Sequence, residues 1–355
     1  MSRFFSSKYD ALEAYTPGEQ PRDLQYVKLN TNESPFPPSP GVIAAAARAA
    51  ETLRLYSDPE SAALTAAVAE RYGVSPSQVL MTNGSDEILN FAFMAFGDAR
   101  HGFVFPDITY GFYPVFAAVN AVPFREIPLR RDFTIDVRDY CGVGQNIVIA
   151  NPNAPTGLLL SVAQIEEIVR TNPEHVVVID EAYIDFGGES CVPLVAKYDN
   201  LLVTQTFSKS RSLAGARLGF GIGAPSLIQD LNTIKYSTNP YNVNRMTAAA
   251  GAAAIADDAY YRANARIIME NRAFTQTELQ KRGFAVLDSA ANFLFAKAPF
   301  ADGETLYRRL KERGILIRHW NKPRIGDWCR ITVGTRAQME ALLAAVDALM
   351  KEETP

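Results

Sequence analysis

Cysteine and histidine are both scarce in this chain of 355 residues. The chain contains three of each: Cys141, Cys191 and Cys329, and His101, His175 and His319. Because the cysteines are odd in number and widely spaced, they predict neither a disulfide framework nor a zinc site. The histidines are equally scattered, so we expect no bound metal.

Long apolar runs and an excess of positive charge are also missing. No segment approaches the ~20 consecutive apolar residues that a membrane helix needs, and the N-terminus lacks an apolar stretch of signal-peptide length. The formal net charge is −4 at pH 7, which leaves no basic footprint for nucleic acid. We therefore expect a cytoplasmic enzyme that acts on small molecules, without nucleic-acid or membrane partners.

The length and the proline pattern predict an arm and two domains. A chain this long exceeds one average domain, and 48% hydrophobic residues supply ample material for a core. The proline cluster at residues 35–40 cannot lie inside a helix, so it separates an N-terminal arm from the alanine-rich helix that begins near Gly41. The predicted parts are an arm at residues 1–40, a large domain at residues 41–260 and a small C-terminal domain at residues 261–355.

Both predicted domains show the alternation that is typical of α/β proteins. From about residue 57 to residue 256, helical and strand-like runs alternate, which predicts βαβ units and a mostly parallel sheet. A long charged helix near residues 260–282 would bridge the domains. Beyond it we expect strands near residues 285–287, 293–296, 315–317 and 330–333, and helices near residues 303–313 and 336–351.

The most informative segment is the loop that carries Lys209. It reads Thr206-Phe207-Ser208-Lys209, and Arg217 follows eight residues after the lysine. An amine used for covalent chemistry must be partly neutral, whereas an unperturbed lysine titrates near ~10.4, so we expect positive charge or desolvation around it. Arg217 would supply the charge, and together with Ser208 it would also hold a phosphate.

Two strand-like runs place polar side chains near this lysine. Residues 175–179 form a β-branched run that ends at Asp180, with Tyr183 three residues later, and the run at residues 200–206 leads to Lys209. Buried parallel strands read as continuous apolar runs, and open α/β sheets bind ligands at the carboxyl ends of their strands. These side chains are therefore expected in one crevice.

A candidate anion site lies further upstream. The segment Asn-Gly-Ser-Asp-Glu at residues 83–87 precedes an apolar helical run at residues 88–91. The free backbone N–H groups and the dipole at a helix N-terminus favour an anion there, and Gly84 lets the backbone approach closely.

Ten short motifs span nearly the whole chain, at residues 29–35, 56–59, 83–87, 109–113, 151–157, 180–183, 206–220, 239–241, 291–293 and 329–335. Together they resemble the pyridoxal-phosphate-dependent aminotransferases of fold type I, and within them the histidinol-phosphate aminotransferases. The resemblance implies an α/β fold with a mostly parallel seven-stranded sheet flanked by helices, plus a smaller C-terminal α/β domain. It also implies pyridoxal 5'-phosphate as cofactor, a homodimer with shared active sites, and amino transfer between L-histidinol phosphate and 2-oxoglutarate.

The resemblance assigns cofactor roles residue by residue. Lys209 would hold the cofactor covalently and carry the α-proton, and Asp180 would keep the pyridine nitrogen protonated. Tyr183 would bond the ring oxygen, and Tyr110 would stack on the ring. The residues implied around the phosphate are Gly84, Ser85, Asp86, Thr206, Ser208 and Arg217, with Tyr56 reaching in from a partner subunit.

One position departs from the family pattern. Many members have an asparagine immediately before Pro-Thr-Gly that bonds the cofactor's ring oxygen, yet this chain has Ala154 there and Asn153 one residue earlier. We expect Asn153 to take over this contact. If it does not, Tyr183 would carry the contact largely alone.

Substrate binding is assigned to arginines, because a planar guanidinium holds carboxylate and phosphate groups with two hydrogen bonds. Arg330 occupies the family's carboxylate position. Arg318 resembles the arginine that binds the distal phosphate of histidinol phosphate, helped by Tyr15 of the arm. Asn32 is a further substrate-binding candidate. Since histidinol phosphate has no carboxylate, both arginines would face its phosphate, and the two carboxylates of glutamate would use the same pair.

Three alternatives remain open at this point. An aromatic amino-acid aminotransferase would use the same scaffold, and a threonine-phosphate decarboxylase would share the phosphate-binding logic while releasing CO₂. A non-catalytic, cofactor-binding regulator belongs to another class of protein. The chain shows no DNA-binding segment or basic tail for it, and the presence of Lys209, Asp180 and Tyr183 opposes it.

Overall fold

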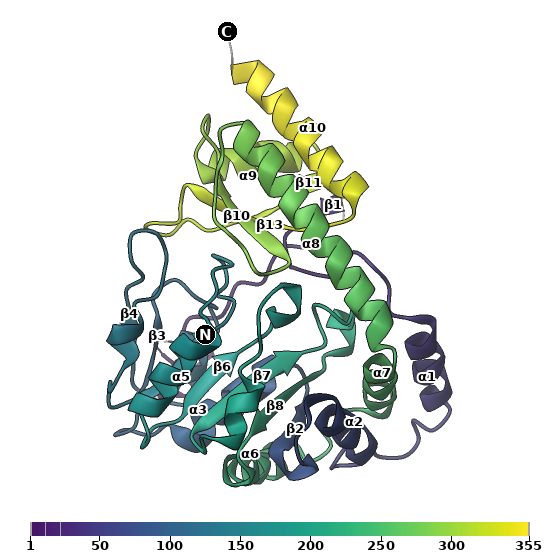
Figure 1. The fold of residues 1–355 in the computed structure, drawn as a ribbon, viewed down its shortest axis with the longest axis vertical. Helices are drawn as coiled ribbons and strands as arrows, with labels where there is room; N and C mark the ends of the chain where they lie inside the picture. The colour runs from purple at the N-terminus through teal and green to yellow at the C-terminus, as the bar shows by residue number, and fades with distance from the viewer. Residues whose placement is uncertain (1, 11, 22, 354–355) are drawn as a thin grey trace.

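The computed structural model describes residues 2–10, 12–21 and 23–353 (Figure 1). Residues 1, 11 and 22 of the predicted arm, and residues 354 and 355 of the predicted C-terminal domain, lie outside the described residues. Within the described part, no helix is both long and apolar enough to cross a membrane.

A seven-stranded sheet forms the centre of the larger part of the molecule. Its strands are β2 (Val79–Thr82), β3 (Phe103–Pro106), β4 (Phe124–Ile127), β5 (Asn146–Ala150), β6 (Val177–Asp180), β7 (Leu201–Thr206) and β8 (Gly219–Gly223). The spatial order is β2-β8-β7-β6-β5-β3-β4, and β8 alone runs antiparallel to its neighbours. The mostly parallel sheet predicted from the sequence is confirmed.

Helices cover both faces of this sheet (Figure 1). They are α1 (Pro40–Ala50), α2 (Ala62–Tyr72), α3 (Ser85–Phe96), α4 (Tyr113–Val119), α5 (Val162–Thr171), α6 (Pro225–Thr238) and α7 (Arg245–Ala256). The sides of a strand alternate, so Ile147 and Ile149 of β5 join one apolar cluster with Ile165 of α5, while Val148 joins another with Ile88 of α3. Burial on both faces explains why these strands are continuous apolar runs.

Two glycines of β8 bring α3 close to the sheet. A Cβ at Gly219 would lie 2.4 Å from the backbone nitrogen of Ser85, and one at Gly221 would lie 2.0 Å from Ile88. Only glycine leaves room for this approach. The N-terminus of α3 is thereby held beside the end of β7.

The C-terminal part is a second, smaller α/β layer. It contains α8 (Asp258–Lys281), β9 (Ala285–Val286), β10 (Phe293–Lys297), α9 (Gly303–Glu312), β11 (Ile315–Leu316), β12 (Arg318–His319), β13 (Trp328–Thr332) and α10 (Arg336–Glu353). Four of these strands form an antiparallel sheet in the order β12-β13-β10-β9. In Figure 1, α8 runs from the large sheet up to this layer. The proposed domain limit at residue 261 falls inside α8, and the domain limits remain a prediction.

The N-terminal segment returns to the C-terminal layer. Strand β1 (Val27–Lys28) pairs in parallel with β11, and the backbone nitrogen of Thr332 donates to Leu29 O at 2.9 Å. Residues just after β1 therefore lie along β13. Short 3-10 turns complete the described part: η1 (Ser7–Tyr9), η2 (Pro76–Gln78), η3 (Val137–Tyr140), η4 (Ile184–Phe186), η5 (Val192–Ala196) and η6 (Ala214–Ala216).

Candidate active site

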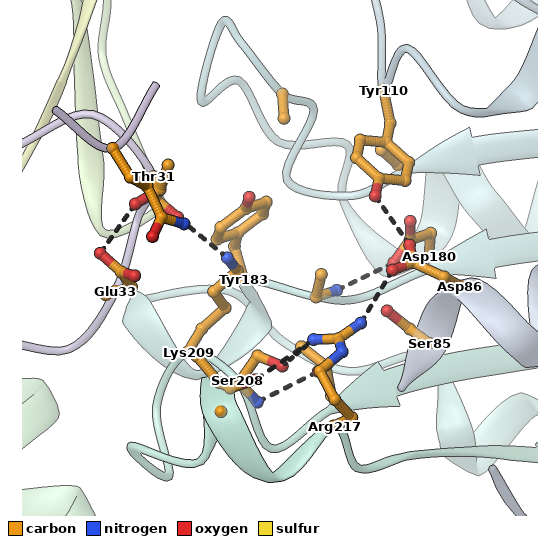
Figure 2. A pocket seen from close by; sticks show the side chains of 17 residues that line it. Thr31, Glu33, Ser85, Asp86, Tyr110, Asp180, Tyr183, Ser208, Lys209 and Arg217 are labelled. Atoms are coloured by element: carbon orange, nitrogen blue, oxygen red, sulfur yellow. Dashed lines mark hydrogen bonds and ion pairs between the residues drawn. The ribbon is translucent and has the colours of Figure 1, made fainter. Parts of the chain in front are cut away.

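A cavity of about 370 Å³ opens at the carboxyl ends of the central strands (Figure 2). Nine of the predicted site residues line it: Ser85, Asp86, Tyr110, Asp180, Tyr183, Thr206, Ser208, Lys209 and Arg217. They meet because β6 ends at Asp180, β7 leads into the Lys209 loop, and α3 begins beside both. Three lining residues that the sequence reasoning did not single out are Gln20, Thr31 and Glu33.

Lys209 presents its amine at the wall of this cavity. Its Nζ donates to Thr31 O at 3.3 Å and lies 5.8 Å from the centre of the Tyr183 ring. Burial, helped by the positive charge of Arg330, lowers the pKa of Lys209 to about 8. Desolvation, which the sequence analysis expected, is therefore the main cause of the lowered pKa of Lys209. Arg217 contributes less to this shift than the sequence suggested.

Asp180 is a buried carboxylate opposite this amine. The hydroxyl of Tyr113 donates to its Oδ2 at 2.9 Å, and the backbone nitrogen of Ala182 donates to Oδ1 at 3.2 Å. Burial raises the pKa of Asp180 to about 6. Among the described residues no lysine or arginine bonds it, so the carboxylate suits a cationic group of a ligand.

Tyr113 is a site residue that sequence reasoning missed. It belongs to the same motif as Tyr110 and lies three residues later, on the first turn of α4. Tyr110 precedes the helix, so no helical spacing linked the two tyrosines, and their shared motif was the available signal.

The N-terminus of α3, Ser208 and Arg217 meet at one corner of the cavity. Arg217 donates to Asp86 at 3.0 Å and to Ser208 Oγ at 3.4 Å, and Tyr110 donates to the other oxygen of Asp86 at 2.7 Å. Gly84 caps α3 with φ +83°, where a Cβ would come within 2.7 Å of the Arg217 guanidinium. This corner therefore needs glycine, as the sequence suggested.

Asn32 lies behind the cavity wall rather than in it. Its Nδ2 donates to the Tyr183 hydroxyl at 3.0 Å, and the residue is almost completely buried. The Tyr183 ring packs edge-on against Phe293 with ring centres 5.0 Å apart. The structure gives Asn32 a contact with Tyr183, and its assignment to the substrate stays a prediction.

Asn153 also fails to reach the cavity, which Ala154 lines in its place. The Asn153 amide donates to Ile108 O at 2.9 Å and to Thr156 at 3.1 Å, and it accepts from Thr109 at 2.8 Å. Because these bonds hold the amide inside the turn, the expectation that Asn153 replaces the missing asparagine is not supported.

A second cavity, of about 320 Å³, shares Tyr110 and Ala154 with the first. Arg330 lies in its wall, with its guanidinium 5.2 Å from the Trp320 ring. One nitrogen donates to Asn30 O at 2.9 Å, while its buried Nε has no partner among the described residues. Burial lowers the pKa of Arg330. A guanidinium whose buried Nε has no partner, and which pairs with no carboxylate of the described residues, suits an anionic ligand.

Arg318 binds the arm. It lies opposite Arg330 in the register of β12 and β13, but it donates to Pro17 O at 3.1 Å and Thr16 O at 3.0 Å. It lines neither of these two cavities. The neighbouring Tyr15 does line the second cavity.

Tyr56 lies away from both cavities. Its side chain is 78% exposed, and its ring stacks on Tyr241 with centres 4.7 Å apart. Its assignment to the site of a partner subunit stays a prediction.

Comparison with known proteins agrees with this geometry. The aminotransferase class I and II family matches residues 25–346. The chain is 47% identical to a histidinol-phosphate aminotransferase of Brachyspira hyodysenteriae over 353 residues, covering 99% of this chain and 100% of the relative. It is 49% identical to histidinol-phosphate aminotransferase 2 of Rhizobium meliloti over 351 residues, with coverage of 99% and 100%.

Solved structures show the same fold. A histidinol-phosphate aminotransferase from Sinorhizobium meliloti, in complex with pyridoxal-5'-phosphate, matches with a TM-score of 0.84 and 26% identity, covering 92% of this chain and 91% of that one. A mutant aspartate aminotransferase of Thermus thermophilus matches with a TM-score of 0.81 and 20% identity, covering 97% and 99%. The second likeness concerns the fold alone.

Proposed function

The chain belongs to the histidinol-phosphate aminotransferases, within the class I and II aminotransferases, and we propose that it transfers an amino group between L-histidinol phosphate and 2-oxoglutarate. The products would be imidazole acetol phosphate and L-glutamate, in the biosynthesis of L-histidine. The observation that carries the proposal is the identity of 47–49% over nearly full length to relatives of that name.

The cavity fits pyridoxal 5'-phosphate as cofactor. Asp180 is a buried carboxylate that no cation of the described residues balances, which suits the protonated ring nitrogen. The corner formed by α3, Ser208 and Arg217 suits the phosphate. When bound, the cofactor supplies an electron sink for bonds at the substrate's amine-bearing carbon.

Lys209 would attach the cofactor and then move a proton. With its pKa lowered to about 8, a useful fraction of its Nζ is neutral near pH 7. Released by the substrate amine, Nζ would take the proton from the amine-bearing carbon and return it at the cofactor's C4′ position. Tyr183 would donate a hydrogen bond to the ring oxygen, and Tyr110 would cover the ring.

The second cavity would receive the rest of the substrate. Arg330 would bind the phosphate of histidinol phosphate and a carboxylate of glutamate. Arg318 fastens the arm that carries Tyr15 to the rim of this cavity, and we assign it a share in the same anions. A homodimer with Tyr56 completing the partner's phosphate site belongs to the proposal.

An activity panel tests this function. The purified protein, supplied with pyridoxal phosphate, is offered histidinol phosphate, phenylalanine and threonine phosphate, with and without 2-oxoglutarate, while glutamate and CO₂ are measured. We expect sustained turnover of histidinol phosphate only with 2-oxoglutarate, at a kcat/KM roughly 100-fold above that of phenylalanine, because a phosphate offers the arginines more charge and more acceptor oxygens than one carboxylate, a difference worth ~2–3 kcal/mol.

Each alternative has its own signature in this panel. CO₂ release without 2-oxoglutarate would identify a decarboxylase. Efficient turnover of phenylalanine that survives Arg318→Ala would identify an aromatic aminotransferase. A protein that binds the cofactor, and whose absorbance no amine changes, would favour the non-catalytic regulator.

A further inference from the structure

The Tyr183 hydroxyl has one bonding partner among the described residues, and that partner is Asn32. Asn32 is 1% exposed and adopts φ +58°, a left-handed backbone conformation that asparagine tolerates better than most residues. A buried asparagine held in this conformation behind a cavity residue calls for a physical reason.

The hydrogen bonds around Asn32 form a relay with a defined direction. Its backbone N–H can only donate, and it donates to Thr332 Oγ1 at 3.0 Å. The single proton of that hydroxyl is donated in turn to Asn32 Oδ1 at 3.0 Å. In this arrangement the oxygen end of the amide faces Thr332 and the NH₂ end faces Tyr183.

The direction of the last bond determines where the Tyr183 proton lies. Because Asn32 Nδ2 donates to the phenol oxygen at 3.0 Å, that oxygen is the acceptor and its own proton must point elsewhere. Tyr183 lines the first cavity beside Lys209, as Figure 2 shows. Burial also raises the pKa of Tyr183 above its usual value, so the phenol keeps its proton at neutral pH.

We propose that Asn32 is a positioning residue for the transamination. Its amide turns the Tyr183 hydroxyl so that this hydroxyl donates its proton into the cofactor cavity. The inference rests on the proposed function, in which Tyr183 bonds the cofactor's ring oxygen. With Ala154 lining the cavity and Asn153 held inside its turn, Tyr183 is the remaining candidate donor to that oxygen among the residues assigned to it.

The relay is anchored on the strand that carries the substrate arginine. Thr332 and Arg330 are two residues apart on β13, so they share a face of the strand. Asn292 Nδ2 also donates to Asn32 O at 3.0 Å, and Thr332 N to Leu29 O at 2.9 Å. The arm is thus held on β13 in the one register that brings Asn32 to Tyr183.

Asn32→Asp reverses the relay with little change in shape. A carboxylate at this position accepts from both Thr332 and Tyr183, which draws the phenol proton away from the cavity. A donated hydrogen bond stabilises the anionic ring oxygen, so its loss raises the midpoint pH of the absorbance change of bound pyridoxal phosphate. We expect a rise of about one pH unit, the equivalent of one hydrogen bond.

A double-mutant cycle separates this effect from the added charge. The midpoint is measured for the wild type, Asn32→Asp, Tyr183→Phe and the double variant. We expect Tyr183→Phe alone to raise the midpoint similarly, and Asn32→Asp to add less than about 0.3 unit in that background. If the aspartate variant does not fold, Asn32→Gly replaces it, because glycine keeps the left-handed backbone without strain. We expect a smaller rise of the midpoint pH in Asn32→Gly, and no further rise when it is combined with Tyr183→Phe.

Two results would overturn the inference. One is a midpoint pH that equals the wild-type value in Asn32→Asp, or in Asn32→Gly if the aspartate variant does not fold. The other is an equally large shift in the Tyr183→Phe background, which would show a charge or folding effect that bypasses the phenol. A wild-type protein that stays colourless would instead contradict the proposed function itself.

Discussion

The two ends of the site are built in different ways. The cofactor end takes most of its polar groups from residues 85–217, at the carboxyl edge of one sheet, where Asp86, Ser208 and Arg217 are already joined by hydrogen bonds. The substrate end joins Arg330 to Asn30, across 300 positions of sequence, and leaves the buried Nε of Arg330 without a partner among the described residues.

The two ends of the site are therefore assembled by different parts of the fold. At the cofactor end, strand order brings most of the functional groups together, and the N-terminal segment adds Thr31 beside Lys209. At the substrate end, the position of the groups depends on the docking of the arm against the C-terminal layer. We therefore expect changes at the cofactor end to alter chemistry and cofactor affinity, and changes at the substrate end to alter substrate affinity.

Arg330→Ala should give the largest effect on this comparison. Removing one partner of a desolvated ionic contact costs ~2–5 kcal/mol, or roughly 30-fold to 5,000-fold in kcat/KM. The affinity for pyridoxal phosphate should stay within about threefold of wild type. Steady-state kinetics and a cofactor titration measure both. Arg330→Lys, which keeps the charge without the planar fork, should recover only part of the loss. A cofactor affinity that falls as far as kcat/KM would contradict the separation.

Tyr113→Phe tests the cofactor end in the same manner. Tyr113 stabilises the ionised form of Asp180, so its loss should raise the pKa of Asp180 above the present value of about 6. Cofactor binding needs the ionised carboxylate. As the pH is lowered, the affinity of the variant for the cofactor should therefore begin to fall at a higher pH than that of the wild type, with a loss of ~1.5–3 kcal/mol. Binding titrations from pH 5 to pH 8 measure it.

Tyr140→Phe is the matched control for that substitution. Tyr140 is also a buried tyrosine, but its hydroxyl has no partner among the described residues. Its cofactor affinity should follow the wild-type pH profile. An equal shift in both variants would mean that a general loss of packing, and not the bond to Asp180, is responsible.

The charged Lys209 at the cofactor end should lower the free energy of unfolding of the cofactor-free protein. The pKa of Lys209 is lowered from 10.5 to about 8, so the folded state is penalised in full below pH 8. Between pH 8 and pH 10.5 the unfolded chain binds more protons, and the penalty disappears as pH rises. Without cofactor, Lys209→Met should therefore be more stable than wild type by about 2 kcal/mol at pH 7, with the gain lost near pH 10.5.

Denaturant unfolding of the cofactor-free proteins at several pH values measures this gain. We expect less than the full pKa shift would give, because the cavity admits water. A variant that is equally stable at pH 7, or whose advantage grows above pH 8, would contradict a buried amine that is costly to charge.

The sequence predicts the cofactor end of the site better than the substrate end. The reason is that the position of the substrate end depends on the docking of the arm. Lys209 and Asp180 lie at the ends of apolar runs that are typical of buried parallel strands, so their meeting was predictable. Arg330 was found by resemblance, but the attachment of Arg318 to the arm was not foreseen. Its partners, Thr16 O and Pro17 O, are backbone atoms about 300 positions away, and no local pattern encodes them.

Two amides lie behind the cavity wall, where the sequence did not place them. Asn153 was expected at the cofactor, but a turn of its own segment holds it. Asn32 was expected at the substrate, but its bond to Tyr183 depends on the pairing of the arm with β13. The fold class, by contrast, followed from the alternation of runs, and the strands near residues 285, 293, 315 and 330 were found in place.

Gly84→Ala should give the smallest effect. It adds about 1–2 kcal/mol of backbone strain and a contact of 2.7 Å with Arg217, so it should lower both stability and cofactor affinity. Gly73→Ala is the matched control, since Gly73 also has a positive φ but open space around its Cβ position. It should lower stability alone. Equal cofactor affinity in the two variants would remove Gly84 from the phosphate corner.

The central claim is that the cavity at the end of the large sheet holds pyridoxal phosphate on Lys209. The most direct measurement is mass spectrometry of the protein after reconstitution with pyridoxal phosphate, reduction with borohydride and proteolysis. The account predicts a pyridoxyl group on the peptide that contains Lys209, and none on the corresponding peptide of Lys209→Ala. A label on another lysine, or no label in the wild type, would contradict it.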